Sequence, residues 1–327
     1  MARVATGVVV VFTGHPLGGS TAVCEDLRMA SWRSATPAPA AGAAEIAGNV
    51  LHPSDFLSHV ALARRAPDAR LAPWVRHYWF VAWDLPPGVG HRPRVLPALG
   101  TSLTVEYGRV RRTGTNGPGA FATGPVTRAT FDIGLTGRGG TAGILLHPGV
   151  ASTVFGLAAR ELTDAVLSLE RTSERERSGG AREIPTELVT EQRAFASDAD
   201  RTAARFDEAL LSVDWPDPGP STLVAELVER IEHDPDATSV ARVEGVTGYS
   251  TRTVQRLFAR DLGVGVGWVL RRRRLRDAVR RLDLGHEGSL TELAAECGWY
   301  DHSHFTREFR ELIGVTPSAY RRARRLP

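Results

Sequence analysis

Two stretches in the last third of the sequence decide its fold: SVARVEGVTGYSTRTVQRLFARDLGV at 239–264 and SLTELAAECGWYDHSHFTREFRELIGV at 289–315. They are two copies of one pattern, because apolar, glycine, aromatic and arginine positions recur in the same order. The offset between the copies is 50 residues before the turn and 51 after it, so the second turn contains one extra residue. The matched positions include Gly248 and Gly298, Tyr249 and Trp299, Arg256 and Arg307, and Phe258 and Phe309.

Each copy predicts a helix, a tight turn and a second helix. In the second copy the first helix has one apolar face, made by Leu290, Leu293, Ala294 and Cys297. Gly298 supplies the left-handed residue that ends this helix. We expect Trp299 and Tyr300 to fill the corner that follows.

The second helix of each copy turns a polar face outward. At 100° per residue, the buried sets are Val254, Leu257 and Phe258 in one copy and Phe305, Phe309 and Leu312 in the other. The outward sets are Arg252, Gln255, Arg256 and Ala259, and Ser303, Thr306, Arg307 and Arg310. Because arginine reads guanine, glutamine reads adenine, and hydroxyl groups contact base edges or phosphates, these faces predict nucleic-acid binding.

The stretch between the copies predicts a long connecting helix over 268–284, with Trp268, Leu275, Val279 and Leu282 on its apolar face. Its run Arg271 to Arg274 is either a phosphate clamp or a solvated face. Arg256 and Arg307 have a structural alternative as well, since they could pair with Asp261 and Glu311. Their recurrence in both copies favours DNA contact. After the second copy, Thr316-Pro317 predicts a cap and a last short helix that buries Tyr320.

Residues 221–327 resemble the DNA-binding domain of AraC/XylS-type transcription regulators. The resemblance is carried by Gly298-Trp299, Asp301 to Phe305, Arg307, Phe309, Gly314 to Pro317 and Tyr320-Arg321. The first copy departs from the family pattern at Glu244, where alanine is usual, and at Gly265-Val266, which predicts looser packing or capping there. The resemblance implies two recognition helices from one monomer in successive major-groove segments. It implies these DNA contacts: Arg252, Gln255, Arg256, His302, Ser303, Thr306 and Arg307.

The N-terminal half predicts short strands separated by glycine-containing turns, which is typical of a small β-barrel or sandwich. The predicted strands are 74–83, 101–107, 121–126, 129–135 and 141–146, followed by helical patterns around Val154 to Leu162 and around Phe206 to Leu211. The segments 71–86, 94–97, 143–149 and 161–164 resemble a β-rich sensory-type domain of unknown function that precedes AraC-type domains in actinobacterial regulators. His147 stands where that domain has arginine, which puts an anion-binding role of that site in doubt.

Together these patterns predict an α+β multidomain protein: an N-terminal β-barrel or cupin-like domain followed by a C-terminal all-α double helix-turn-helix domain. We expect four segments: a disordered extension over 1–48, a β-rich sensory or oligomerisation domain with trailing helices over 49–213, a proline-rich linker over 214–220, and the AraC-type domain over 221–327. The length of 327 residues fits two domains.

The composition excludes several classes of protein. Cys24 and Cys297 are the only cysteines, so no zinc finger or disulfide framework can form. No apolar run is long enough to span a bilayer, so we expect a cytoplasmic protein that does not bind membranes. The net charge is +3, and residues 221–327 carry the surplus with 18 arginines against 15 acidic residues.

The sequence contains no nucleophile elbow, phosphate-cradling glycine loop or H-E-x-x-H motif, so we expect no enzyme activity, catalytic residue or cofactor. His77, His91 and His147 with Glu106 could be read as a cupin-like metal site. Their spacing lacks the clustered His-x-His pattern, so we interpret them as structural or pocket histidines. His302 and His304 lack a third ligand, so we expect no metal there either. Trp74, Trp79 and Trp83 are expected in the core, with one or two of them in a ligand pocket.

The prediction is a sequence-specific DNA-binding transcription regulator. Its expected partners are double-stranded DNA and RNA polymerase, and a small-molecule effector and a homodimer are left open. Two alternatives stay open: a small-molecule or metal-dependent enzyme in the β domain, and a weakly DNA-binding scaffold assembled through residues 181–215.

Overall fold

The computed structural model describes residues 42–115, 117–128, 130–169, 198–234 and 236–324. The expected extension over 1–48 lies outside these residues as far as position 41, and so does the part of the expected scaffold segment at 181–197. Residues 42–48 depart from the expectation, because α2 (Ala43–Ile46) forms there. Ile46 is fully buried in a cluster with Val50 and Phe56, which fixes this short segment against the sheet.

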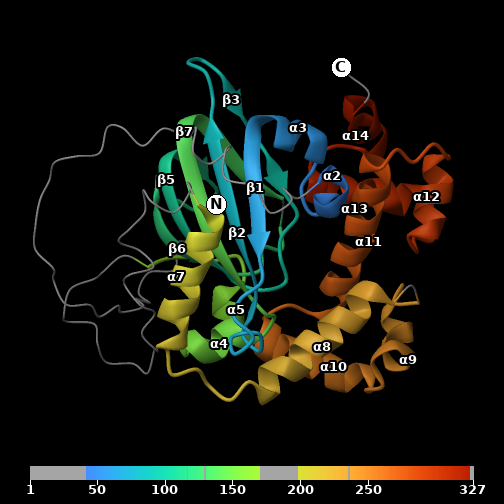
Figure 1. Ribbon diagram of the computed structural model, residues 1–327. Helices are drawn as coiled ribbons and strands as arrows, with labels where there is room; N and C mark the ends of the chain where they lie inside the picture. Colours follow the sequence, from blue (N-terminus) through green and yellow to red (C-terminus); the bar gives the residue numbers. More distant parts are fainter. Residues whose placement is uncertain (1–41, 116, 129, 170–197, 235, 325–327) are drawn as a thin grey trace, which may run out of the picture.

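In the part of the chain that the structure describes, eight strands form one antiparallel sheet with the order β1-β2-β7-β5-β6-β8, and β3 and β4 also pair with β7 (Figure 1). The strands are β1 Val60–Arg65, β2 Val75–Asp84, β3 Gly90–His91, β4 Arg94–Val95, β5 Ser102–Arg112, β6 Gly119–Thr123, β7 Phe131–Leu146 and β8 Val166–Ser168. This confirms the prediction of a β-rich N-terminal part. The structure corrects two details, since β1 was not predicted and the strands expected at 129–135 and 141–146 are the single strand β7.

Helices cover one face of the sheet. They are α4 (Val150–Phe155), α5 (Ala159–Leu162) and α7 (Ala199–Leu211). Phe206 of α7 lies against Tyr78 and Phe80 of β2, with ring centroids 5.3 and 6.0 Å away. The apolar alignment predicted around Phe206 is therefore the face of α7 that packs on the sheet.

The C-terminal helices lie along another side of the sheet (Figure 1). They are α8 Gly219–His233, the 3-10 helix η2 Val240–Arg242, α9 Val243–Thr247, α10 Thr251–Leu257, the π-helical turn η3 Phe258–Leu262, α11 Val266–Asp283, α12 Leu290–Glu296, α13 His302–Ile313 and α14 Pro317–Arg324. The predicted connecting helix is α11, which joins a unit made of α8 to α10 to a unit made of α12 to α14. This confirms an all-helical C-terminal part.

The β-sheet part and the helical part share apolar clusters, although only the segment 214–220 was expected to join them. Leu51 and Leu96 are buried in the core of the α12–α14 unit, and Leu99 is buried in the core of the α8–α10 unit. Arg94 of β4 donates to the Ile313 carbonyl at 2.6 Å. The sheet therefore contacts both helical units directly. Within the described residues no helix is long and apolar enough to cross a membrane.

Candidate nucleic-acid interface

The first helix-turn-helix unit is closed by glycine and by two caps. Gly248, at a φ of +76°, ends α9. The Ser250 hydroxyl accepts a hydrogen bond from the Thr253 amide at 3.2 Å, which caps α10. Glu244 adds a second acceptor, for the Thr251 amide at 2.9 Å. The expectation that Glu244 loosens this region is therefore wrong, because its carboxylate satisfies an amide at the helix N-terminus that has no partner within the helix.

The looser capping expected at Gly265-Val266 is observed at the N-terminus of α11, which has no side-chain cap. Gly265 is the N-cap of α11, and it has no side chain to offer the first amides of that helix. α11 is instead held by its buried side chains, among them Val266, Val269 and Leu270.

The second unit repeats this construction. Gly298, at a φ of +87°, follows α12, and Ser289 and Glu292 form a capping box at its start. The Asp301 carboxylate accepts from the His304 amide at 2.7 Å and caps α13. Phe305 and Phe309 of α13 are fully buried. As in the first unit, the core residues fix which face of the second helix points outward.

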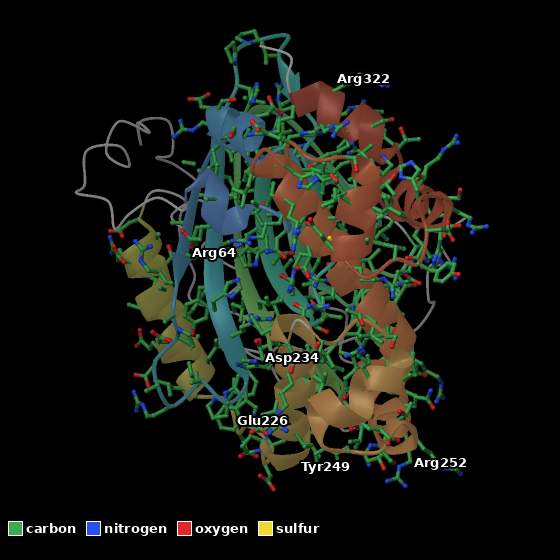
Figure 2. The ribbon with its side chains drawn as sticks, turned by 90° about the vertical axis from the view of Figure 1, so that its right-hand side faces the viewer. Arg64, Glu226, Asp234, Tyr249, Arg252 and Arg322 are labelled. Atoms are coloured by element: carbon green, nitrogen blue, oxygen red, sulfur yellow. The ribbon has the colours of Figure 1, made fainter. Side chains whose placement is uncertain are left out.

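The structure places the predicted DNA-contact residues on the outward faces of α10 and α13. The exposed side chains are Arg252, Gln255, Arg256, His302, Ser303 and Arg307, and Thr306 is partly exposed. The Thr306 hydroxyl lies 3.4 Å from His302 Nε2. Figure 2 shows Arg252 near one end of the molecule and Arg322 of α14 near the other. The two units thus lie at opposite ends of one side.

Arg256 and Arg307 make no hydrogen bond or ion pair within the described residues. Their expected structural partners are taken by other arginines, since Asp261 pairs with Arg260 at 2.6 Å and Glu311 pairs with Arg271. The alternative of local pairing is therefore not realised. Both guanidinium groups are available for a ligand.

The corner between α12 and α13 differs from the prediction. Trp299 is buried, with 4% exposed, and its indole donates to Glu308 at 2.7 Å. Tyr300 does not fill the corner, because its side chain is 97% exposed. Ser250 and Asp301 are equivalent caps, so Tyr300 is the extra residue of the second copy and bulges outward. The shift in offset between the copies was the signal for this exposed aromatic residue beside α13.

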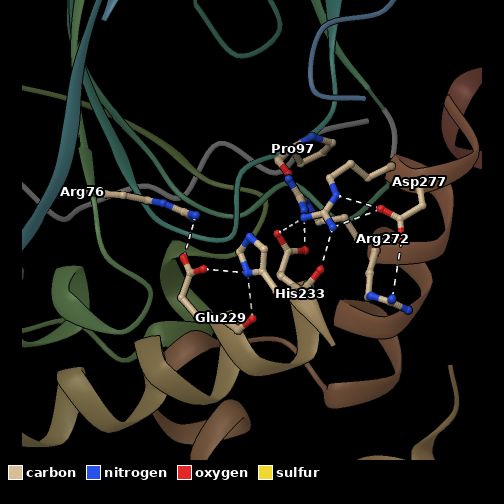
Figure 3. Close-up of polar contacts among 9 residues, drawn as sticks. Arg76, Pro97, Glu229, His233, Arg272 and Asp277 are labelled. Atoms are coloured by element: carbon tan, nitrogen blue, oxygen red, sulfur yellow. Dashed lines mark hydrogen bonds and ion pairs between the residues drawn. The ribbon is translucent and has the colours of Figure 1, made fainter. Parts of the chain in front are cut away.

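The arginine run of α11 is neither a phosphate clamp nor a solvated face. Arg272 and Arg273 are buried, with 5% and 7% exposed. Arg272 lies 2.8 Å from the Glu232 carboxylate of α8, and Arg273 donates to the Ala237 carbonyl at 3.0 Å. Arg274 pairs with Glu308 of α13 at 3.1 Å. The run therefore connects α11 to both helical units (Figure 3 shows the contacts with α8).

The β-domain histidines do not converge with Glu106. That carboxylate pairs with Arg112, whereas His91 lies beside Asp55 and His59, whose ligand atoms all fall within 4.8 Å of one another. The His59 and His91 rings are stacked, with centroids 4.3 Å apart and planes 7° from parallel. Because nitrogen lone pairs lie in the ring plane, this stacking directs them into parallel planes and does not fit a common metal ion.

A cavity of about 960 Å³ lies between the sheet and helices α8 and α11. Trp79 and Trp83 line it, whereas Trp74 stacks on Trp215 elsewhere. One of the expected aromatic groups is therefore outside the pocket and two are in it.

Fold and surface together define a double helix-turn-helix protein with a β-sheet domain. A family model described as a helix-turn-helix domain matches residues 245–323, and one described as a domain of unknown function (DUF6597) matches residues 63–168. The chain is 32% identical to the transcriptional activator NphR of Rhodococcus over 133 residues, which span 39% of each protein. It is 33% identical to the transposon Tn10 TetD protein of Escherichia coli over 103 residues, 31% of this chain and 74% of that protein.

Among solved structures, a probable AraC family transcriptional regulator from Rhodopseudomonas palustris is 28% identical, covers 32% of this chain and all of its own, and has a TM-score of 0.29. The chain belongs to the AraC-type helix-turn-helix transcription regulators. Its match to NphR spans well under half of that relative.

Proposed function

We propose that the protein binds a specific two-part DNA sequence and regulates transcription by recruiting or blocking RNA polymerase in the cytoplasm. The observation that carries the proposal is the pair of unpaired arginines, Arg256 and Arg307, at equivalent positions of two capped helices. Arginine in this setting reads guanine through a bidentate pair of hydrogen bonds. The function requires no catalysis.

The arrangement of the two units supports a two-part site. Since α10 and α13 belong to one chain and are joined by α11, one monomer presents both helices. Major-groove segments on one DNA face recur about every 34 Å, and this is the separation we propose for the two helices on DNA. Arg252, Gln255 and Arg256 would contact one half-site. His302, Ser303, Thr306 and Arg307 would contact the other.

We propose in addition that a small molecule controls this activity. The cavity of about 960 Å³ lies at the upper end of the size range of small-molecule sites and has aromatic walls. It touches both the sheet and the helices that carry the DNA-binding units, so its occupancy bears on their arrangement.

The test is an unbiased selection of genomic fragments by the full-length protein, repeated at two salt concentrations and with the Arg256→Ala/Arg307→Ala double variant. We expect a recurrent two-part motif that the double variant does not enrich. Fragments enriched equally by both proteins, or none at all, would contradict base reading by these helices. The matched control is the double variant Arg109→Ala/Arg201→Ala, which removes two exposed arginines of β5 and α7, outside α10 and α13.

A further inference from the structure

The cavity between the sheet and helix α11 has the features of a site for one chemical class. We propose that it binds a small aromatic carboxylate, with its anion on Arg64 and its apolar body on Trp79 and Trp83. This deepens the proposed control by a small molecule and rests on it only for the effect on DNA binding. Figure 2 shows Arg64 on the sheet, on the side that carries the DNA-binding helices.

Strand register places the proposed binding groups on one face of the sheet. Arg64 of β1 is paired with Trp79 of β2, which is paired with Gly143 of β7, which in turn is paired with Thr104 of β5. Side chains of paired residues point to the same face. This row therefore runs across the cavity floor, with a cation at one end and a hydroxyl at the other.

Two glycines of β7 let the indole rings lie over its backbone. A Cβ atom at Gly143 would lie 2.1 Å from the Trp79 ring, and one at Gly139 would lie 2.3 Å from the Trp83 ring. Neither approach is compatible with a side chain. The cavity floor is therefore a platform of two aromatic rings, which suits a flat apolar ligand.

The cavity wall is positively charged. It carries eight arginines against five carboxylates. Six of the eight arginines already pair with a carboxylate: Arg76, Arg112, Arg272, Arg273, Arg276 and Arg281. The net charge of the wall is positive, so a ligand with negative charge is favoured. Because few of the arginines are unpaired, the wall suits an anion with a single charge better than a phosphate with several.

Two arginines of the cavity wall, Arg64 and Arg280, have side chains with no hydrogen-bond or ion-pair partner among the described residues. Arg280 is exposed on α11, whereas the Nε of Arg64 is buried without an acceptor. Burial lowers the pKa of the Arg64 guanidinium, an effect that Glu45 opposes. A buried donor without an acceptor is costly, and a carboxylate fits the planar guanidinium through two parallel hydrogen bonds. This donor set is what selects a carboxylate.

The other wall belongs to the DNA-binding part. Arg76 of β2 pairs with Glu229 of α8 at 2.6 Å, and Arg272 of α11 donates to the Pro97 carbonyl (Figure 3). These contacts span the cavity from the sheet to α8 and α11. A ligand on Arg64 therefore lies beside the contacts that hold the helices to the sheet.

Calorimetry on the full-length protein tests the ligand class. The probes are indole-3-acetate and 2-naphthoate, their neutral carboxamides, and inorganic phosphate. We expect each carboxylate to bind at least about tenfold more tightly than its carboxamide, as charge-assisted hydrogen bonds imply, and phosphate to bind weakly. Arg64→Gln should abolish the preference for carboxylate, and Arg64→Lys should retain part of it.

Arg65→Gln is the matched control. Arg65 is adjacent in sequence, points to the opposite face and pairs with Asp200, so its substitution should leave the preference intact. Carboxamides that bind as tightly as carboxylates, absence of carboxylate binding, or equal losses in the Arg64 and Arg65 variants would overturn the inference. A melting curve for each variant separates loss of binding from loss of fold.

DNA binding of the same proteins separates the two proposals. If carboxylates bind no more tightly than carboxamides while sequence-specific DNA binding persists, only the inference about the ligand is refuted. If the protein prefers carboxylates over carboxamides but prefers no DNA sequence, the proposed function is refuted and the ligand site is supported.

Discussion

Glu232 is the carboxylate on which the contact between α8 and α11 depends. Its side chain is 6% exposed and lies between Arg272, at 2.8 Å, and Arg276. Arg272 is itself buried, with 5% exposed. Replacing Glu232 by glutamine keeps the shape and removes the negative charge that both arginines contact. Arg272 is then left buried without a counter-ion, whereas Arg276 keeps its pair with Asp277 at 3.1 Å.

The expected cost follows from the burial of this group. Removing one partner of a buried ion pair typically costs about 3 to 5 kcal/mol, and because the amide can still accept a hydrogen bond we expect the lower end, about 3 kcal/mol, in the free energy of unfolding. Burial alone would raise the pKa of Glu232, but Arg272 and Arg276 lower it below its usual value. The stabilisation is therefore present at neutral pH and is lost progressively as the pH falls below 4.5, the ordinary pKa of this carboxyl group.

Urea denaturation at pH 7 and at pH 3 measures both effects. Glu229→Gln is the control, one turn away on α8, where the carboxylate is 40% exposed in its pair with Arg76. An exposed pair contributes at most about 1 kcal/mol. If Glu232→Gln costs no more than Glu229→Gln at pH 7, or if its cost does not shrink in acid, the reasoning about this buried pair is refuted.

Four further predictions follow from single side chains. Arg307→Ala should cost about 1 to 3 kcal/mol of binding on a selected DNA site and relax preference at one or two base pairs; a loss of equal size on every sequence would make it a phosphate contact. Tyr300, 97% exposed beside α13, should weaken DNA binding when changed to alanine and leave the melting temperature unchanged; unaltered binding would exclude it from the interface. Burial raises the pKa of Asp283 to about 7, so folding favours its protonated form and the free energy of unfolding should fall as the pH rises from about 4 to 7; a titration in which Asp283→Asn shows the same fall would rule this out. Burial raises the pKa of Cys297 to about 12, so in a Cys24→Ser background native protein should not react with Ellman's reagent at pH 8, whereas urea-unfolded protein should; labelling of the native protein would contradict its burial.

The helical units could be predicted because their signals are local. In both copies the spacing of apolar residues, the glycine of the turn and the capping residue lie within about 25 residues of one another, and the side chains predicted to be buried, such as Val254 and Phe309, are buried. The faces of α10 and α13 follow directly from that periodicity. Whether Arg256 and Arg307 contact bases stays a prediction.

The contacts between the two parts could not be predicted, because their partners are far apart in the sequence. Arg272 was expected at a phosphate or in solvent, and its partners are Glu232 and Pro97, which lie 40 and 175 positions away. A run of arginines carries no local sign of such partners. For the same reason Leu96 and Leu99 gave no hint that they complete the cores of the helical units.

Within the sheet, two glycines led to a wrong prediction. Gly139 and Gly140 suggested a turn between two strands, whereas they make room in one long strand for Trp83 and Tyr107, as Gly143 does for Trp79. Glycine marks both turns and close approach, and only the facing aromatic residues distinguish the two. For this reason the sequence did not predict that these glycines and the facing aromatic residues form the cavity floor.

The spacing of the two half-sites tests the central claim most directly. On a selected two-part site, five base pairs inserted between the halves rotate one half to the opposite face of the duplex, since a turn of DNA is about 10.5 base pairs. Binding of the full-length protein should then fall to the level measured on a single half-site. Affinity that survives the insertion would show that α10 and α13 do not bind together from one monomer, and would contradict the account.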